Sequence, residues 1–161
     1  MLSLNENLIA GAEMSIAIES QMLIRKSINI VFNAFVDPVI ASQFWFSSST
    51  GHLEKGKTVK WTWEKYKAVT DVHVLDIKEH ELIRIEWGEP QTKVDFRFEK
   101  ISAMETYVVI KNYDIPLEGE ALINFVIDST GGFTTVLDAA KIHLEHDIQP
   151  NLVQDKFPPF K

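Results

Sequence analysis

Apolar and polar residues alternate over several short stretches of this chain, and apolar residues recur at helical spacing near its C-terminal end. Residues 14–26 carry Ile16, Ile18, Met22 and Ile24 at even positions, which predicts a first strand with one buried face. The same alternation predicts five more strands, over residues 59–64, 68–77, 82–87, 93–99 and 106–114. Because short turns separate these segments, we expect an antiparallel sheet.

Two short helices are predicted between the first strand and the rest of the sheet. Residues 27–36 have helical spacing, and Asn29 is the expected cap. Asp37 and Pro38 predict a second helix start, with Asp as N-cap and Pro at the first helical position. An aromatic cluster follows, consisting of Phe44, Trp45 and Phe46.

A long helical pattern begins at Glu118 and keeps its phase across Gly131 and Gly132, so one kinked helix and two helices both fit. Each glycine costs about 1 kcal/mol relative to alanine, which a close approach of helix and sheet would offset. Farther along, one face is apolar (Phe133, Leu137, Ala140, Leu144) and the opposite face is expected to be exposed (Thr134, Asp138, Lys141, Glu145). The small residue Ala140 predicts either a close backbone neighbour or a cavity beneath the helix.

Composition predicts a single soluble domain over residues 14–149, with an N-terminal extension at 1–13 and a Pro-rich tail at 150–161. The tail is too rich in proline for a helix, and we expect it to pack on the same domain through Leu152, Val153, Phe157 and Phe160. A net charge of -7 argues against nucleic-acid binding. The absence of cysteine, of a signal-like start and of a long apolar run predicts a cytoplasmic protein without a membrane span.

The order of these elements, together with two sequence motifs, resembles the START-like (SRPBCC) superfamily. The first motif is Val31 to Phe35 with Asp37-Pro38 and Trp45-Phe46, and the second runs from Gly132-Phe133 to Leu144-Glu145. Within that superfamily the chain is most similar to bacterial homologues of the activator of the heat-shock protein 90 ATPase. The resemblance covers about residues 15–147, with Phe133 where tryptophan is common.

This resemblance implies an α+β helix-grip fold, in which a curved antiparallel sheet of six or seven strands wraps around a long C-terminal helix. It allows a seventh strand near His52 and Leu53, and it implies a cavity between sheet and helix but no fixed catalytic set. The aromatic strand positions then become candidate ligand-binding residues that line this cavity: Trp61, Trp63, Trp87, Phe96, Phe98, Phe133, Leu137 and Asn112. The alternative is a solid core in which these side chains interdigitate.

Other polar groups carry weaker signals. Asp71 and His73 share a strand face and could act as an acid–base pair, although a solvated patch is the simpler interpretation. His143, His146 and Asp147 have helical spacing, yet no further metal ligand is evident. Asp114 could lie at the cavity mouth beside Asn112. The hydroxyl run from Ser47 to Thr50 is interpreted as a loop. We therefore assign no catalytic residue, no metal site and no cofactor.

Three functions remain open from the sequence. The first is binding of a small hydrophobic or aromatic ligand, and the second is a chaperone-interacting protein, as the family name implies. The third is a cyclase or hydrolase that uses the same cavity, for which Asp71, His73 and Asp114 are the first residues to inspect. The expected partners are a small apolar molecule and a chaperone, and the sequence leaves the ligand identity and oligomeric state undetermined.

Overall fold

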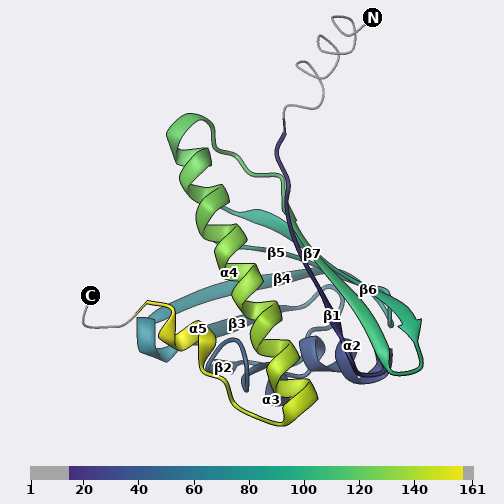
Figure 1. Cartoon of the computed structure of the whole chain (residues 1–161). Helices are drawn as coiled ribbons and strands as arrows, with labels where there is room; N and C mark the ends of the chain where they lie inside the picture. Colours follow the sequence, from purple (N-terminus) through teal and green to yellow (C-terminus); the bar gives the residue numbers. More distant parts are fainter. Residues whose placement is uncertain (1–14, 158–161) are drawn as a thin grey trace, which may run out of the picture.

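A computed structural model describes residues 15–157. It shows an antiparallel sheet of seven strands with a long helix across one face, and therefore confirms the helix-grip fold (Figure 1). The elements in chain order are β1 (Ile18–Ile24), α2 (Ile28–Val36), α3 (Pro38–Ala41), β2 (Ser48–Ser49), β3 (Thr58–Trp63), the short 3-10 helix η1 (Glu64–Tyr66), β4 (Ala68–Lys78), β5 (Leu82–Trp87), β6 (Thr92–Ser102), β7 (Glu105–Tyr113), α4 (Gly119–His146) and α5 (Leu152–Asp155).

The strands lie in the order β1-β7-β6-β5-β4-β3-β2, so β2 to β7 form a meander and β1 pairs with β7 at the far edge. The two helices predicted after the first strand, α2 and α3, carry the chain from one sheet edge to the other, so β1 is not joined to the meander by a short turn. Both helices therefore lie under the curved sheet, at the same end of the molecule as the C-terminal half of α4 (Figure 1).

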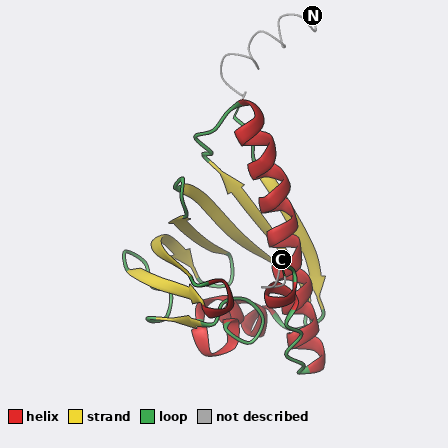
Figure 2. Ribbon diagram, turned by 90° about the vertical axis from the view of Figure 1, so that its left-hand side faces the viewer, coloured by secondary structure: helices red, strands yellow, loops and turns green. Residues whose placement is uncertain are grey.

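The predicted alternation determines which side of the sheet is packed. On β6 and β7, Val94 pairs with Asn112, Phe96 with Ile110, and Phe98 with Val108, and all six side chains are buried. α4 runs along this face, as the view turned by 90° shows (Figure 2). The first strand begins at Ile18 and not at residue 14, since Ile16 is exposed.

The seventh strand differs from the expectation. It is the pair Ser48–Ser49 within the predicted hydroxyl loop, and not the segment around His52 and Leu53. Backbone bonds hold its register, Ser47 N to Thr62 O at 2.8 Å and Thr50 N to Lys60 O at 3.1 Å. The hydroxyls of Thr50 and Ser47 add bonds from Lys60 N and Glu64 N, both at 2.9 Å. A strand held by hydrogen bonds and not by buried side chains leaves no apolar period in the sequence.

The two short helices begin as local chemistry requires, with one correction. Asp37 accepts a hydrogen bond from Val39 N at 2.9 Å and Pro38 is the first helical residue of α3, which confirms the predicted start. Asn29 is not a cap, because α2 begins at Ile28 with Ser27 in the N-cap position.

The long helical pattern forms one helix, α4, across both glycines. Ala140 is fully buried, as are Ala139 and Leu137. Of the two predicted possibilities, a close neighbour and not a cavity therefore lies beneath the helix at Ala140. The other face of α4, which was expected to be exposed, contacts the edge strand β1: Thr134 Oγ1 lies 3.2 Å from Ser20 Oγ, and Lys141 Nζ donates to Leu23 O at 2.7 Å.

The Pro-rich segment does contain helix, contrary to expectation, because α5 spans Leu152–Asp155. Leu152 and Val153 pack against the core as predicted, whereas Phe157 is exposed. Phe160 and the extension at residues 1–13 lie outside the described residues. Among the described residues, no helix combines the length and apolarity needed to cross a bilayer.

Candidate functional site

A pocket of about 320 Å³ opens between α4, the β5–β6 turn and the neighbouring ends of β6 and β7. The four aromatic residues around it come from three places: β5, α4 and the segment that follows α3. Its lining residues are Trp45, Trp87, Gly88, Glu89, Pro90, Thr92, Asn112, Phe125, Asp128, Ser129, Gly132, Phe133, Val136 and Val153.

The walls of this pocket are aromatic rings in mutual contact. The ring centroids of Trp87 and Phe133 are 5.9 Å apart, and Trp45 lies 6.0 Å from Trp87 and 6.3 Å from Phe133. Trp45 and Phe133 are themselves almost completely buried. Because neighbouring core side chains hold these rings, the wall exists before any ligand arrives.

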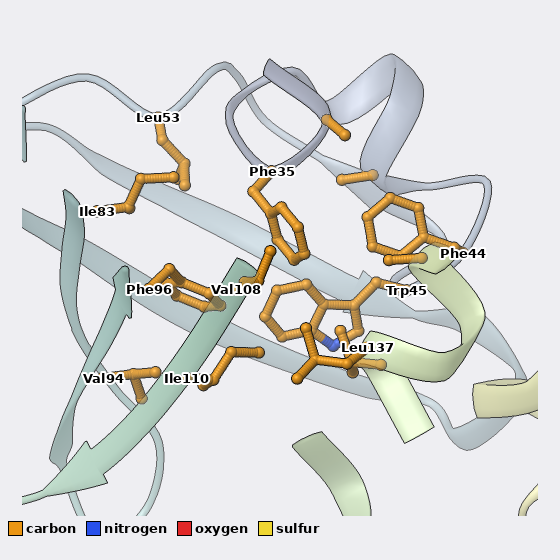
Figure 3. Packing of buried hydrophobic residues seen from close by; sticks show 14 of the residues in the cluster. Phe35, Phe44, Trp45, Leu53, Ile83, Val94, Phe96, Val108, Ile110 and Leu137 are labelled. Carbon is orange, nitrogen blue, oxygen red and sulfur yellow. The ribbon is translucent and has the colours of Figure 1, made fainter. Parts of the chain in front are cut away.

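Trp45 separates the pocket from the filled part of the interior. It follows α3 and lies beside Phe35, Phe44 and Leu137 in the close view of the core (Figure 3). Its ring centroid is 4.7 Å from that of Trp61 and 5.8 Å from that of Phe96. The aromatic cluster after the two short helices therefore closes one end of the sheet–helix space, and the pocket occupies the other.

Polar atoms meet at the inner end of the pocket around Asn112. Its Nδ2 donates to Thr92 Oγ1 and to the backbone carbonyl of Lys93, both at 2.8 Å, and its Oδ1 accepts from Ser129 Oγ at 2.8 Å. The carbonyl of Lys93 can only accept, so it determines the orientation of the amide. Asn112 is 1% exposed, and this network joins β7, β6 and α4.

The mouth of the pocket is formed by the β5–β6 turn and by α4. Gly88 has φ +91, a conformation that L side chains rarely adopt, and Glu89 and Pro90 follow it. From α4, Asp128 lies across from this turn as a second lining carboxylate. Both Glu89 and Asp128 are exposed.

Gly132 is open toward this pocket. A Cβ atom built there meets no atom within 4 Å, so the predicted close approach of helix to sheet at the glycine pair is wrong at this residue. At Gly131, a Cβ would lie 3.4 Å from the Nζ of Lys156, the flexible end of a side chain. The two glycines therefore widen the space beside α4 instead of narrowing it.

A second hollow of about 570 Å³ lies on the other side of the same helix segment, and Asp128, Gly132 and Val153 line both. The C-terminal segment forms part of its wall. Tyr66 Oη is 2.8 Å from the carbonyl oxygens of Val153 and Gln154, and Lys65 pairs with Asp155 at 3.2 Å. The tail is thus bound to η1 beside the pocket.

The residues predicted to line the cavity separate into two groups. Trp87, Phe133 and Asn112 line the pocket, and Trp63 lines the second hollow. Four others pack in the filled core instead: Trp61, Phe96, Phe98 and Leu137. Trp45, Phe125, Thr92 and Ser129 line the pocket and were not among the predicted residues.

The candidate catalytic groups do not lie in this pocket. Asp71 is exposed and pairs with Lys60 at 2.6 Å, which lowers its pKa, and His73 Nδ1 lies 2.8 Å from Thr58 Oγ1. Both line a separate hollow of about 390 Å³, which shares Trp87, Gly88 and Glu89 with the pocket. Asp114 pairs with Lys93 at 3.0 Å.

The proposed metal ligands are likewise not brought together. His143 Nδ1 lies 2.9 Å from the carbonyl oxygen of Ile148. In the part of the chain that the structure describes, no group of three or more His, Cys, Asp or Glu side chains could hold a metal ion.

Several solved structures share the fold. A protein from Staphylococcus saprophyticus, SSP2350, is 28% identical with a TM-score of 0.72, and the match covers 83% of this chain and 94% of that one. The Aha1 dimer from Colwellia psychrerythraea is 15% identical with a TM-score of 0.68, over 81% of this chain and 97% of that one. An HSP90 activator from Plasmodium falciparum is 17% identical with a TM-score of 0.60, over 80% and 94% of the two chains.

No curated protein matches the chain. A family model does match, over residues 25–145. This range includes α2, the six strands β2 to β7 and nearly all of α4. The matched segment is most of the chain and contains both sequence motifs described above. The chain therefore belongs to the family of Activator of Hsp90 ATPase homolog 1-like proteins.

Proposed function

We propose that this protein binds a small, largely apolar molecule in the pocket beside Gly132. The observation that carries the proposal is a hollow of about 320 Å³ whose walls are Trp45, Trp87 and Phe133 and whose inner end is the Asn112 network. Apolar walls with a few fixed polar groups are typical of small-molecule sites. Family membership supports it, since the helix-grip fold encloses space between sheet and helix.

The chemistry of the lining favours binding over catalysis. Ser129 is the one lining serine among the described residues, and its hydroxyl donates to Asn112 and not to a base. The lining contains no histidine, lysine or cysteine. A nucleophile needs a positioned base, and Ser129 has none, while the two lining carboxylates, Glu89 and Asp128, are exposed at the mouth.

The test compares ligand binding in the wild type and in a variant with a filled pocket. Gly132→Leu places its side chain in the open space, so we expect it to abolish heats of binding for neutral bicyclic aromatics such as naphthylethanol. Gly131→Leu is the matched control, because Gly131 lines the second hollow and not the pocket. Equal binding by both variants, or no binding of naphthylethanol, other aromatics or fatty acids by the wild type, would overturn the proposal.

Regulation of a chaperone is the second candidate function, and the family match over residues 25–145 is what favours it. The relative from Plasmodium falciparum is itself described as an HSP90 activator. An ATPase assay with an Hsp90-type chaperone separates the two candidates. Stimulated turnover that persists in Gly132→Leu would support a chaperone role independent of the pocket, whereas unchanged turnover would count against this second candidate.

A further inference from the structure

The hydroxyl groups at the inner end of the pocket differ in what they offer a ligand. Thr92 accepts from Asn112 and keeps its own hydrogen, whereas Ser129 offers only an acceptor. Both Nδ2 hydrogens of Asn112 are used, one by Thr92 and one by the carbonyl of Lys93. Ser129 donates its only hydroxyl hydrogen to Asn112 Oδ1, so its oxygen can only accept a hydrogen bond from a ligand. A ligand that reaches Ser129 must therefore donate.

The charged residues at the mouth of the pocket also favour a ligand that donates hydrogen bonds. Glu89 and Asp128 are the charged residues of the lining, and the lining contains no lysine, arginine or histidine. Neither carboxylate forms an ion pair within 4.0 Å among the described residues. The whole chain has a net charge of -7, so its long-range field also disfavours anions.

The walls suit a positive charge as well as an apolar ring. Trp87 and Phe133 present aromatic surface between the mouth and the Asn112 network, and a cation near such a ring is attracted by its quadrupole. An anion meets negative charge or lone pairs at the ring faces, at Ser129 and at the mouth, and is therefore repelled. Aromatic walls alone would not distinguish a neutral ligand from a cationic one, whereas the walls and acceptors together do.

We propose that the pocket selects an aromatic amine in its protonated form, with the ring system against Trp87 and Phe133 and the ammonium group toward Ser129, Asp128 and Glu89. This inference rests on the proposed ligand-binding function and specifies the chemical class of its ligand. The pocket volume limits the ring system to about the size of a bicyclic aromatic.

Calorimetric titration with three probes that share one ring tests the inference: naphthylethylamine, naphthylethanol and naphthylacetate. We expect the amine to bind about tenfold more tightly than the alcohol, and the acetate to bind more weakly than both. Raising the salt concentration should reduce the preference for the amine, because the carboxylates are exposed.

The charge contribution is isolated with the double variant Glu89→Gln/Asp128→Asn. It should lose about fivefold in affinity for the amine and change by less than about twofold for the alcohol. The matched control is Glu120→Gln/Asp138→Asn, which removes two charges from the same helix outside the pocket. Both affinities should stay within about twofold in this control, because neither Glu120 nor Asp138 lines the pocket.

The outcomes of these titrations distinguish the two proposals. Binding of all three probes with equal affinity, or tightest binding of the acetate, would overturn the amine inference and leave the ligand-binding function standing. An equal loss of amine affinity in both double variants would also overturn it. If none of the probes binds, both proposals fail, whereas tight amine binding that is lost in Glu89→Gln/Asp128→Asn and kept in the control confirms the inference.

Discussion

Ser129 of α4 donates a 2.8 Å hydrogen bond to Oδ1 of Asn112, which is buried at the end of β7. This bond joins helix and sheet beside the pocket that opens between them. Since Asn112 also bonds to Thr92 and to the backbone of Lys93, one amide holds three elements in position. The pocket is therefore preorganised by a polar group inside an otherwise apolar core.

The Asn112 network should contribute measurably to stability. Asn112→Ala removes three hydrogen bonds, so we expect the free energy of unfolding to fall by about 2–3 kcal/mol. Ser129→Ala removes one of them and should cost about 1 kcal/mol. Chemical denaturation checks both values, and a larger cost for Ser129→Ala than for Asn112→Ala would contradict this description of the network.

The glycines of the pocket should respond in opposite directions to alanine. Gly132→Ala gains helix propensity and its Cβ enters open space, so unfolding should become less favourable by about 1 kcal/mol. Gly88→Ala should lose at least about 1 kcal/mol, because φ is +91 and the Cβ would lie 3.3 Å from Pro90 O. Thermal denaturation measures both changes in stability. If both variants are stabilised or both are destabilised, the backbone at Gly88 or at Gly132 does not have the geometry described here.

Asp95 on the outer side of the sheet should make stability depend on pH. Burial alone raises its pKa, but hydrogen bonds from Arg84 at 2.8 and 2.9 Å and from Tyr113 at 2.9 Å outweigh burial and hold the pKa below the ordinary value. Its stabilising contribution is therefore present above the unfolded-state pKa of about 3.9, and is lost as pH falls through the lower folded-state pKa.

Asp95→Asn should accordingly destabilise the protein by about 3 kcal/mol at neutral pH, because Arg84 loses its buried partner. The difference from the wild type should shrink as the pH falls below about 4. Denaturation at a series of pH values measures it, with Asp71→Asn as the exposed control that should change stability far less. If the destabilisation caused by Asp95→Asn does not vary with pH, the charge of the Asp95 carboxylate is not what stabilises the folded protein.

The edge strand β1 should depend on two side chains of α4. Glu145 accepts from the backbone N–H of Arg25 at 2.8 Å and from Lys141 at 2.7 Å, and Lys141 also donates to Leu23 O. Glu145→Gln weakens a charge-assisted bond, so hydrogen exchange of the Arg25 amide should accelerate about fivefold. Amides of β5, at the centre of the sheet, serve as the internal reference, and acceleration there to the same extent would indicate global destabilisation instead.

The sheet and the helix starts could be predicted because they follow from local chemistry. Alternation along β3, β5 and β6 identified the buried face, and Asp37 with Pro38 identified the start of α3. The strand Ser48–Ser49 could not be found, since backbone bonds to β3 form it and its side chains have no apolar period. The helix α5 could not be found either, because only two of its residues, Leu152 and Val153, pack against the core.

The location of the pocket could be predicted only in part. Alternation shows which side of the sheet a ring occupies, but not whether a second element fills the space in front of it. Trp61 and Phe96 face the same side as Trp87, yet Trp45 packs against both of them and closes that end of the interior. The position of Trp45 depends on how α3 meets the sheet, which no local pattern specifies.

Binding in the pocket is tested most directly by an amide and indole chemical-shift titration of nitrogen-labelled protein with naphthylethylamine, followed by the same titration of Gly132→Leu. We expect saturable shifts in the wild type at Trp87, Ser129, Gly132 and the side-chain amide of Asn112, and none at these sites in the variant. Shifts confined to the residues around Asp71 and His73, or unchanged spectra in the wild type, would contradict binding in the pocket.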